Sequence, residues 1–525
     1  MMSIGTSKKK QLELTDKDRS QLRAHGISVE EASRQIQLLK NPPYYANLDR
    51  PCTIGDGIHL IDDSQHAELI ELYTKALLDG RFSKFVPASG AATRMFKDLL
   101  YILEKQPQPN RHELDILAKS GSKEAKAVVK FLANLNHMPF FEQLKEMLQQ
   151  DINQIKAGDN YIIILEKLLM PGGLNYAELP KGLLPFHLYE GSPRTSFEEH
   201  IVEAAHLIKD IRGKCRLHFT VSPEHLDRFH TLFKNCRSKY EKLFKIKLDI
   251  EFSLQKKSTD MLALAADGSP FYDESGNLML RPGGHGALIE NLIDLKGDLI
   301  FIKNIDNVQP DKDKTALLYY KKILAGFLLK IQSEIFENLR TLNSASVDDS
   351  QLTNILNFIK NILQRNIKSS VWLELGSVEN KKLFLINQLN KPLRVCGMVR
   401  NTGEPGGGPF WVREGDSTSA QIVEGAQVDQ GSLEQASIFN SSSHFNPVDL
   451  VCSVKDFQGN HFDLKKFINQ EAIIKTNKSY RGRSLIACER PGLWNGSMGD
   501  WNTLFVDVPE STFTPVKSVL DFLRK

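Results

Sequence analysis

The sequence has few of the features that place a protein in a membrane or on a nucleic acid. Its net charge is only +3 over 525 residues, so no strong electrostatic attraction to nucleic acid is expected. The most apolar segment, residues 323–331, is far too short to span a bilayer and is bounded by lysines. We therefore expect neither a nucleic acid nor a membrane among the partners.

Cysteine motifs and targeting signals are also lacking. The six cysteines are scattered and form no C-x-x-C pair, which argues against the usual zinc motifs and against a disulfide framework. The first residues contain no apolar core of the kind that a secretory signal needs. These absences predict a cytoplasmic protein with reduced thiols. Its length and ordinary composition allow more than one globular domain.

The most informative stretch of the chain is residues 280–310. It begins with a glycine-rich turn, and the apolar spacing of residues 287–295 then predicts a helix. Leu299–Ile302 is short, apolar and β-prone, as a buried strand is, and it ends in Asn304–Asn307. In open α/β sheets, ligands bind beyond the carboxyl ends of the strands. Asp306 therefore lies where a carboxylate could hold a divalent cation beside a phosphate.

A second turn of small residues follows an expected strand at Phe82–Pro87. It reads ASGAATRM over residues 88–95, and the residues after it look helical as far as Glu104. A strand, a tight turn and a helix can cradle phosphate, because backbone N–H groups and the helix N-terminus face the anion. An ordinary connection between a strand and a helix is the competing interpretation.

Together, the two stretches resemble the UDP-sugar pyrophosphorylases, which are nucleotidyltransferases with a GT-A-type fold. The likeness rests on Gly-His-Gly before a helix and on an apolar strand that closes on N-I-D-N. The family's first turn reads G-G-x-G-T-R-[LM]. Gly90, Thr93 and Arg94 match it, whereas Ser89 and Ala92 stand where the family has glycine. The resemblance implies that the Ser89–Thr93 turn binds the nucleotide and that Arg94 acts on its phosphates.

The same family has a lysine-containing segment, which in this chain lies unusually far after the first turn. The family has P-K-[PGA]-[ML]-[LV]-P soon after its first turn, and Leu179–Pro185 resembles that segment. Residues 98–170, whose apolar side chains have helical spacing, lie between the first turn and this segment. We interpret them as a helical insertion that separates two parts of one site. The resemblance gives Lys181 a catalytic role as a positive charge on phosphate. The alternative is a solvated loop lysine.

A glutamine follows the strand expected at Leu248–Leu254. Uridylyltransferases carry a glutamine in this place, and the resemblance implies that Gln255 and the backbone of Gly284-His285-Gly286 hold the base. An amide offers a donor and an acceptor at fixed spacing, as the edge of uracil requires. A solvent-facing strand end remains a strong competitor for Gln255.

Late in the chain, Phe445-Asn446-Pro447-Val448-Asp449 is similar to an F-x-P-V-K segment of uridylyltransferases. An aspartate replaces the family's lysine, and an anion beside a triphosphate is repulsive unless a cation lies between them. One hypothesis makes Asp449 a second Mg²⁺ ligand opposite Asp306. The other is an accidental match in which Asp449 caps a turn.

Two other glycine-rich segments have open interpretations. Residues 401–409 predict a hairpin loop or, alternatively, a lid over a substrate. Residues 494–501, WNGSMGDW, suit either a sugar-binding loop or buried packing.

Altogether we expect an α/β protein with a GT-A, Rossmann-like mixed sheet flanked by helices. Its predicted parts are a helical region at 1–80, a nucleotidyltransferase-like domain at 81–390 and a β-rich region at 391–525. The resemblance implies a Mg²⁺-dependent transfer between a nucleoside triphosphate, UTP being favoured, and a sugar 1-phosphate. The alternatives are a GT-A glycosyltransferase, which would need a D-x-D-like pair, and a nucleotide-binding protein without catalysis.

Overall fold

The computed structural model describes residues 14–41, 44–148, 158, 160–190, 192–344, 346–403, 406–415 and 417–523. Three sequence predictions extend beyond these ranges. Residues 1–13, 42 and 43 of the expected N-terminal region and 149–157 and 159 of the expected insertion lie outside the described residues, as do Glu404 and Pro405 of the segment at 401–409.

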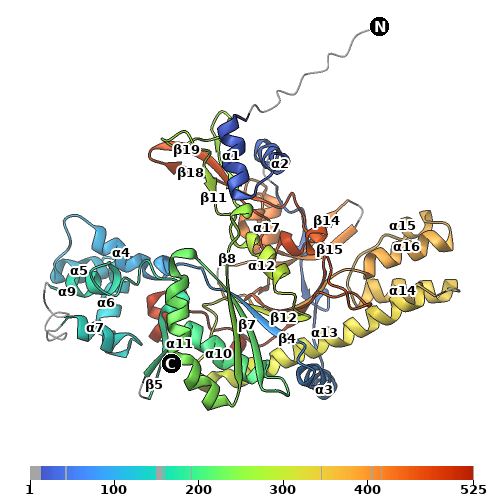
Figure 1. Cartoon of the computed structure of the whole chain (residues 1–525), viewed down its shortest axis with the longest axis horizontal. Helices are drawn as coiled ribbons and strands as arrows, with labels where there is room; N and C mark the ends of the chain where they lie inside the picture. Colours follow the sequence, from blue (N-terminus) through green and yellow to red (C-terminus); the bar gives the residue numbers. More distant parts are fainter. Residues whose placement is uncertain are drawn as a thin grey trace, which may run out of the picture.

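A mixed ten-stranded β-sheet runs through the centre of the molecule (Figure 1). Its path is β2-β3-β20-β13-β17-β12-β4-β7-β8, and β16 also pairs with β13. β17 is antiparallel to β12 and β13, whereas the other pairs on the path are parallel. The strands are β2 (Thr53–Ile54), β3 (Gly57–His59), β4 (Phe82–Pro87), β7 (Lys214–Val221), β8 (Lys247–Leu254), β12 (Leu299–Lys303), β13 (Leu393–Arg400), β16 (His444–Phe445), β17 (Asp449–Ser453) and β20 (Asn502–Asp507). The predicted fold class, a mixed α/β sheet flanked by helices, is confirmed.

The order of the strands reverses at β4. From β4 the chain continues to β7 and β8 on one side, and β12 then pairs with β4 from the other side. The connections that leave β4 and β12 therefore emerge at the same edge and diverge. Such a switch point is where open α/β sheets form a ligand-binding crevice.

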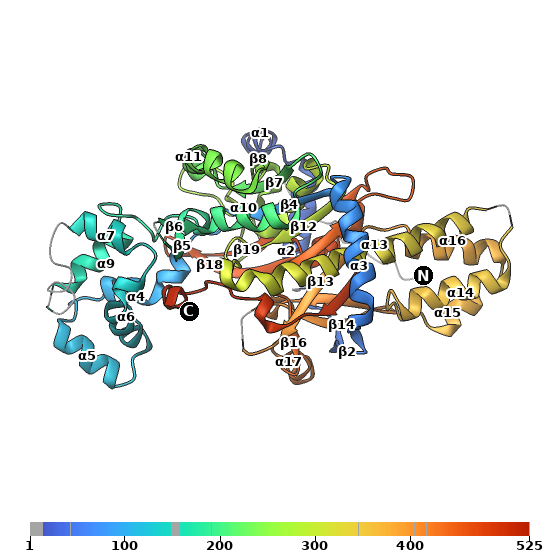
Figure 2. The ribbon, with the colours of Figure 1, turned by 90° about the horizontal axis from the view of Figure 1, so that it is seen from below.

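Helices cover one face of the sheet, and Figure 2 shows three of them lying across it: α3 (Asp63–Leu78), α10 (Ser196–Leu207) and α13 (Lys314–Leu342). The alternation of side chains along the strands explains why a hydrophobic core lies on each face of the sheet. Phe82 and Phe301 belong to the core under these helices, whereas Phe85 and Ile302 face the core that contains α12 (Ile289–Asp294). Successive side chains of a strand point to opposite faces, so both faces of these strands are buried.

Two groups of helices extend from the sheet at opposite ends of Figure 1. One is the segment predicted as an insertion, and its apolar side chains form a core of their own with the C-terminal Val516, Val519 and Phe522. It contains α4 (Lys97–Glu104), α5 (Arg111–Lys119), α6 (Lys123–Ala133), α7 (Phe141–Leu148) and α9 (Tyr161–Leu169). The other group, called the helical arm below, contains α14 (Asp349–Asn361), α15 (Ser369–Glu374) and α16 (Val378–Leu389).

The expected division of the chain differs from the observed pairing of strands. The boundary at residue 390 falls inside the sheet, because β13, β17 and β20 form its middle and one of its flanks. The first eighty residues are not wholly helical either. They contain α1 (Asp16–His25) and α2 (Val29–Lys40), but also β1 (Leu48–Pro51), β2 and β3. β1 pairs with β14 (Gly408–Glu414) and β3 with β20, and such distant pairing leaves little local trace in a sequence.

Candidate functional site

A cavity of about 630 Å³ opens at the switch point. It gathers residues from five separate parts of the chain, namely the turn after β4, the lysine segment, the end of β8, the segment around β12 and the segment before β20. Its lining residues are Pro87, Ser89, Gly90, Ala91, Thr93, Arg94, Lys181, Gln255, Gly284, His285, Leu288, Asn304, Ile305, Asp306 and Trp494. The structure thus brings together every predicted site residue except Gly286 and Asp449.

Backbone hydrogen bonds join the first turn to the lysine segment. The N–H of Ala92 donates to Leu179 O over 2.9 Å, and the N–H of Lys181 donates to Gly90 O over 3.0 Å. The helical segment between these two stretches leaves and returns at one place. Arg94 and Lys181, although far apart in sequence, therefore line the same cavity.

The side chains of the first turn are not equally available to a ligand. The hydroxyl of Thr93 donates to Ala177 O over 2.7 Å, so it fastens the turn to the segment that precedes Lys181. The methyl group of Ala92, which replaces a glycine of the pyrophosphorylase pattern, is buried in the insertion core and does not face the cavity. Arg94 is exposed, and no hydrogen bond or ion pair of its side chain occurs within the described ranges. Its guanidinium is free to meet an anion.

Lys181 and Asp306 form an ion pair inside the cavity. Nζ of Lys181 donates to Oδ2 of Asp306 over 2.7 Å, and both side chains are 12% exposed. The backbone beside Asp306 is held firmly, because the Ser196 hydroxyl and Nε2 of His200, both on α10, lie within hydrogen-bonding distance of Ile305 O. The carboxylate predicted to hold a metal thus has a cation as its partner.

The protein ligands in the cavity fit Mg²⁺ only if phosphate oxygens of the substrate complete the coordination of the ion. No group of three or more His, Cys, Asp and Glu side chains suited to a metal ion occurs in the described part of the chain. Mg²⁺ is commonly held by one or two carboxylates together with phosphate oxygens. Asp306, beside cations that suit phosphate, meets that requirement.

The Gly-His-Gly turn is shaped by a segment from the far end of the chain. Gly284 has φ +70°, which favours glycine, and a Cβ at Gly286 would lie 2.2 Å from Pro491 O. These glycines thus allow residues 489–494 to lie directly on the turn. Gly286 itself is buried and contributes backbone rather than lining surface.

His285 stacks on Trp494 at the wall of the cavity. Their ring centroids are 4.2 Å apart with an interplanar angle of 25°. The backbone N–H of Leu493 donates to Nδ1 of His285 over 3.1 Å, so the ring proton resides on Nε2. Burial lowers the pKa of His285, which favours the neutral ring. The pair forms a flat aromatic surface with one N–H donor.

Gln255 follows β8 directly and lines the cavity between the two glycine-rich turns. No hydrogen bond of its side-chain amide to another described residue occurs, so both its donor and its acceptor are available. The competing interpretation, a solvent-facing strand end, does not describe a half-buried residue in a cavity wall.

Asp449 does not share this site. It begins β17, is buried, and accepts a hydrogen bond from the Lys321 ammonium on α13. Although burial opposes it, Asp449 raises the pKa of Lys321, so the two charges neutralise each other under the helices. Asp449 does not line the cavity that contains Asp306. The hypothesis of a second Mg²⁺ ligand is therefore abandoned. The likeness of residues 445–449 to F-x-P-V-K could not reveal that Lys321, on a distant helix, is the partner of Asp449.

A family model described as "Domain of unknown function (DUF4301)" matches residues 15–525. The chain belongs to the DUF4301 family. A comparison with curated proteins gives no match. Of the helices that the structure describes, none combines the length and apolar character that a bilayer-spanning segment needs.

Among solved structures, the DUF4301 chain is similar to a mutant UDP-glucose pyrophosphorylase from Leishmania major in complex with UDP-glucose. The two share 12% identity and a TM-score of 0.44, with 97% of this chain and 79% of that chain covered. It is also similar to the uridine diphosphate N-acetylglucosamine pyrophosphorylase from Trypanosoma brucei in complex with an inhibitor. There the identity is 12%, the TM-score 0.48, and the coverage 97% and 79%.

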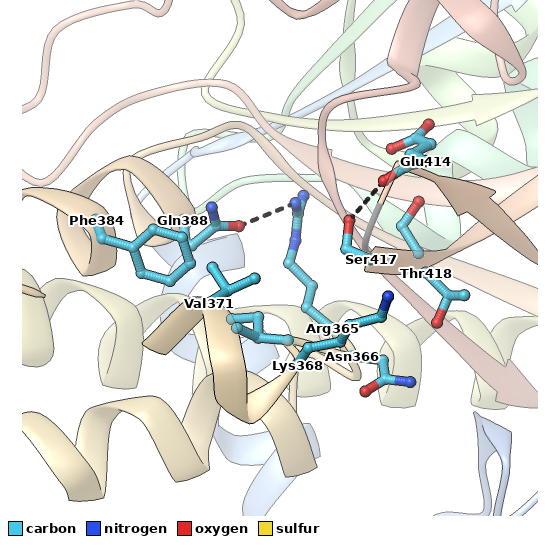
Figure 3. A pocket seen from close by; sticks show the side chains of 11 residues that line it. Arg365, Asn366, Lys368, Val371, Phe384, Gln388, Glu414, Ser417 and Thr418 are labelled. Atoms are coloured by element: carbon cyan, nitrogen blue, oxygen red, sulfur yellow. Dashed lines mark hydrogen bonds between the residues drawn. The ribbon is translucent and has the colours of Figure 1, made fainter. Parts of the chain in front are cut away.

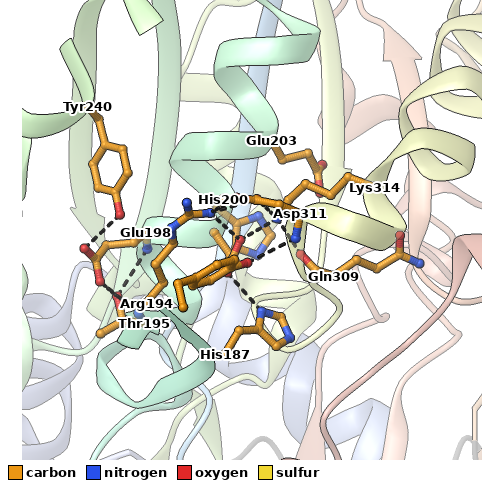
Figure 4. Close-up of polar contacts among 12 residues, drawn as sticks. His187, Arg194, Thr195, Glu198, His200, Glu203, Tyr240, Gln309, Asp311 and Lys314 are labelled. Carbon is orange, nitrogen blue, oxygen red and sulfur yellow. Dashed lines mark hydrogen bonds and ion pairs between the residues drawn. The ribbon is translucent and has the colours of Figure 1, made fainter. Parts of the chain in front are cut away.

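The residues of α10 that support the DUF4301 site could not be predicted from the sequence. This helix buries Glu198, Glu199 and Glu203, each of which has polar partners. Figure 4 shows part of this network, with the Tyr240 hydroxyl pointing at Glu198 and Lys314 beside Asp311. Buried charges require partners, so the network holds α10 firmly under the β12 tip. Taken alone, the S-F-E-E-H-I-V-E pattern of α10 predicts an amphipathic helix whose acidic side chains are exposed to solvent.

Proposed function

We propose that this chain is a nucleotidyltransferase that joins a nucleoside triphosphate and a sugar 1-phosphate, giving a nucleotide sugar and pyrophosphate. One observation carries the proposal: Arg94, Lys181 and Asp306 come from three separate segments and converge in one cavity at the switch point of the sheet. Two cations and one carboxylate suit a polyphosphate with its divalent cation. UTP is the favoured nucleotide, because the free amide of Gln255 can pair with the edge of uracil.

Such a transfer needs positioning and charge neutralisation more than covalent chemistry. An oxygen of the sugar 1-phosphate attacks the α-phosphorus in line. A new P–O bond forms, the bond from that phosphorus to the bridging oxygen breaks, and pyrophosphate leaves with the electron pair. Arg94 and Lys181 stabilise the charge on the phosphates, and Lys181 must leave Asp306 to do so. Asp306 would hold Mg²⁺, which supplies charge neutralisation between phosphate oxygens.

The aromatic wall suits the remaining part of the substrate. Trp494 and His285 present a flat surface at the cavity wall, and Nε2 of His285 carries a proton. Flat apolar faces and single donors are typical of sites for sugar or ribose rings. Trp494 lines the cavity and also packs in a hydrophobic core with Trp501, so it is compatible with both interpretations of residues 494–501.

The Lys181–Asp306 ion pair favours a second candidate function, nucleotide binding without turnover. An ammonium that remained on the carboxylate would exclude the metal. The glycosyltransferase alternative has weaker support, since Asp306 is the only acidic side chain among the described residues that line the cavity.

Pyrophosphate release from UTP, ATP, CTP and GTP, each with a panel of sugar 1-phosphates and Mg²⁺, tests the proposal. We expect release with UTP and one or more sugar 1-phosphates, and its loss in Asp306→Asn. The exposed Asp313→Asn is the matched control and should keep full activity. Full activity of Asp306→Asn would overturn the metal role. UTP binding without pyrophosphate release from any pair would favour the second candidate.

A further inference from the structure

The end of β8, from which Gln255 enters the cavity at the switch point, is held only weakly by its own packing. β8 lies at the edge of the sheet and pairs along its length with β7. Its final residue, Leu254, is 36% exposed, so the packing of this side chain holds the strand end weakly. A side chain that recognises a ligand has to be held to within about 0.5 Å. A contact from another element is therefore needed to fix Gln255.

Asn291, on α12, makes that contact. This residue is buried, and its helix follows directly on the Gly-His-Gly turn. Its Nδ2 donates to Leu254 O over 2.9 Å and to the Ser253 hydroxyl over 2.8 Å. Because only the NH₂ side of an amide can donate to a carbonyl, these contacts determine the orientation of the side chain. Asn291 does not line the cavity, so its effect on a ligand is exerted through the end of β8.

The groups on either side of Asn291 are themselves fixed. The Ser253 hydroxyl lies 2.7 Å from Nε2 of His218 on β7. The ring of His218 stacks on Phe85 of β4, with 5.5 Å between the centroids and an interplanar angle of 12°. α12 is anchored by Ile289 and Leu292, which belong to the hydrophobic core on that face of the sheet. The network therefore joins the end of β8 to the middle of the sheet and to the helix after the Gly-His-Gly turn.

A second contact joins the same helix to the residue after Gln255. Nζ of Lys256 lies 2.6 Å from Oδ2 of Asp294, the last residue of α12. These two side chains are 38% and 55% exposed, and exposed ion pairs contribute little to holding a segment in place. The buried amide of Asn291 is therefore the stronger of the two contacts.

We propose that Asn291 is a positioning residue for recognition of the nucleotide base. Through the carbonyl of Leu254 it sets the place of Gln255 relative to the Gly-His-Gly backbone, which leads into its own helix. This inference rests on the proposed function, in which Gln255 and that backbone hold uracil. Loss of the amide lets the end of β8 shift, which weakens the contacts to the base and leaves those of Arg94 and Lys181 to phosphate unchanged.

The ratio of the Kd values of ATP and UTP, measured on the full chain by equilibrium dialysis with Mg²⁺, tests this role. Asn291→Leu removes both donated hydrogen bonds at similar volume, so the ratio should fall at least about three-fold, mainly through weaker UTP binding. Asn291→Ala removes the same donors without adding bulk, and it takes the place of the leucine variant if circular dichroism shows that variant to be unfolded. A role in stability alone would weaken the binding of both nucleotides equally and leave the ratio unchanged.

A double-substitution cycle decides whether Asn291 acts through Gln255. In a Gln255→Ala background, Asn291→Leu should leave the ratio unchanged, because the group that it positions is gone. Asp294→Asn, which removes only the exposed ion pair, should change the ratio less than about two-fold. Figure 3 shows Asn366 beside a second cavity, of about 240 Å³, which shares no lining residue with the cavity at the switch point. Asn366→Leu is the matched control and should leave the ratio unchanged.

Two results would overturn the inference, and they differ in what they say of the proposed function. A wild-type protein that binds UTP no more tightly than ATP would contradict the proposed reading of uracil, and this inference with it. A wild-type preference for UTP that persists in Asn291→Leu and Asn291→Ala would overturn the inference alone. Additive effects of the Asn291 and Gln255 substitutions on the ratio would do the same.

Discussion

At the scale of single residues, Lys181 competes with a metal ion for Asp306, and Asp306 competes with a triphosphate for Lys181. Their ion pair, 2.7 Å long, occupies the carboxylate. Lys181→Met should free Asp306, so Mn²⁺ should bind the nucleotide-free variant several-fold more tightly than wild type. The same variant should bind UTP at least about ten-fold more weakly, because one phosphate cation is gone.

Electron paramagnetic resonance of free Mn²⁺ and equilibrium dialysis of UTP would measure the two effects separately. Lys312→Met, an exposed lysine beyond the β12 tip, is the control and should change neither. Unchanged Mn²⁺ affinity in Lys181→Met would show that the ion pair does not govern access of the metal to Asp306.

Gln255 decides, in the proposed function, which nucleotide the cavity prefers. Its amide is available, and the edge of uracil offers one donor and one acceptor to match it. Gln255→Ala should reduce the preference for UTP over ATP by about five-fold, mainly through weaker UTP binding, since a lost hydrogen bond in a partly buried site costs about 1 kcal/mol. The ratio of Kd values gives this result directly. An unaltered ratio would reject the base-reading role, and Gln458→Ala, in an exposed turn, is the matched control.

At the scale of elements, α10 supports the site through buried charge. Glu203 accepts from Lys84 over 2.9 Å and from Lys303 over 2.8 Å, and all three side chains are at most 1% exposed. Burial lowers the pKa of Lys84 to about 7 against the attraction of Glu203. Glu203→Gln would leave two buried lysines without their carboxylate and should lower the free energy of unfolding by about 3–5 kcal/mol.

Urea denaturation of Glu203→Gln and of a surface control would check this estimate. Glu68 pairs with Lys330 at 3.0 Å, but its side chain is 54% exposed. Glu68→Gln should therefore change the free energy of unfolding by less than about 1 kcal/mol. Equal effects of the two substitutions would contradict the view that α10 is fixed by its buried charges.

The elements also show what a single sequence can and cannot predict. The strand–turn–helix unit after Phe82 and the strand that ends in Asn304–Asp306 were predictable, because their patterns are local. Trp494 had two open interpretations, since its contact with His285 joins residues more than two hundred positions apart. Asp449 was misassigned because its partner, Lys321, lies on another element. Local periodicity in the sequence predicts the helices and strands, whereas contacts between distant segments determine which side chains meet in the site.

At the scale of the whole molecule, both ends of the chain complete one sheet. β13, β17 and β20 come from the last quarter of the sequence, yet they cover the free edge of β12 and share the core under α13. Cutting the chain between Asn390 and Lys391 would leave residues 1–390 with an open strand edge and an exposed apolar face. Neither fragment should then unfold cooperatively by itself, since residues 1–390 lose the middle and one flank of the sheet and residues 391–525 lose most of the core under the helices.

Coexpression of fragments 1–390 and 391–525 should restore a complex that copurifies and unfolds in one cooperative transition. The association depends on the buried face of β13, so Val395→Asp in the second fragment should abolish it, because an unpaired carboxylate would enter the core under the helices. Lys478→Met in the same fragment alters an exposed side chain and should leave the complex intact. Circular dichroism of fragment 1–390 alone is the decisive control. A cooperative transition there, at the temperature of the whole chain, would show that the boundary near residue 390 separates true domains after all.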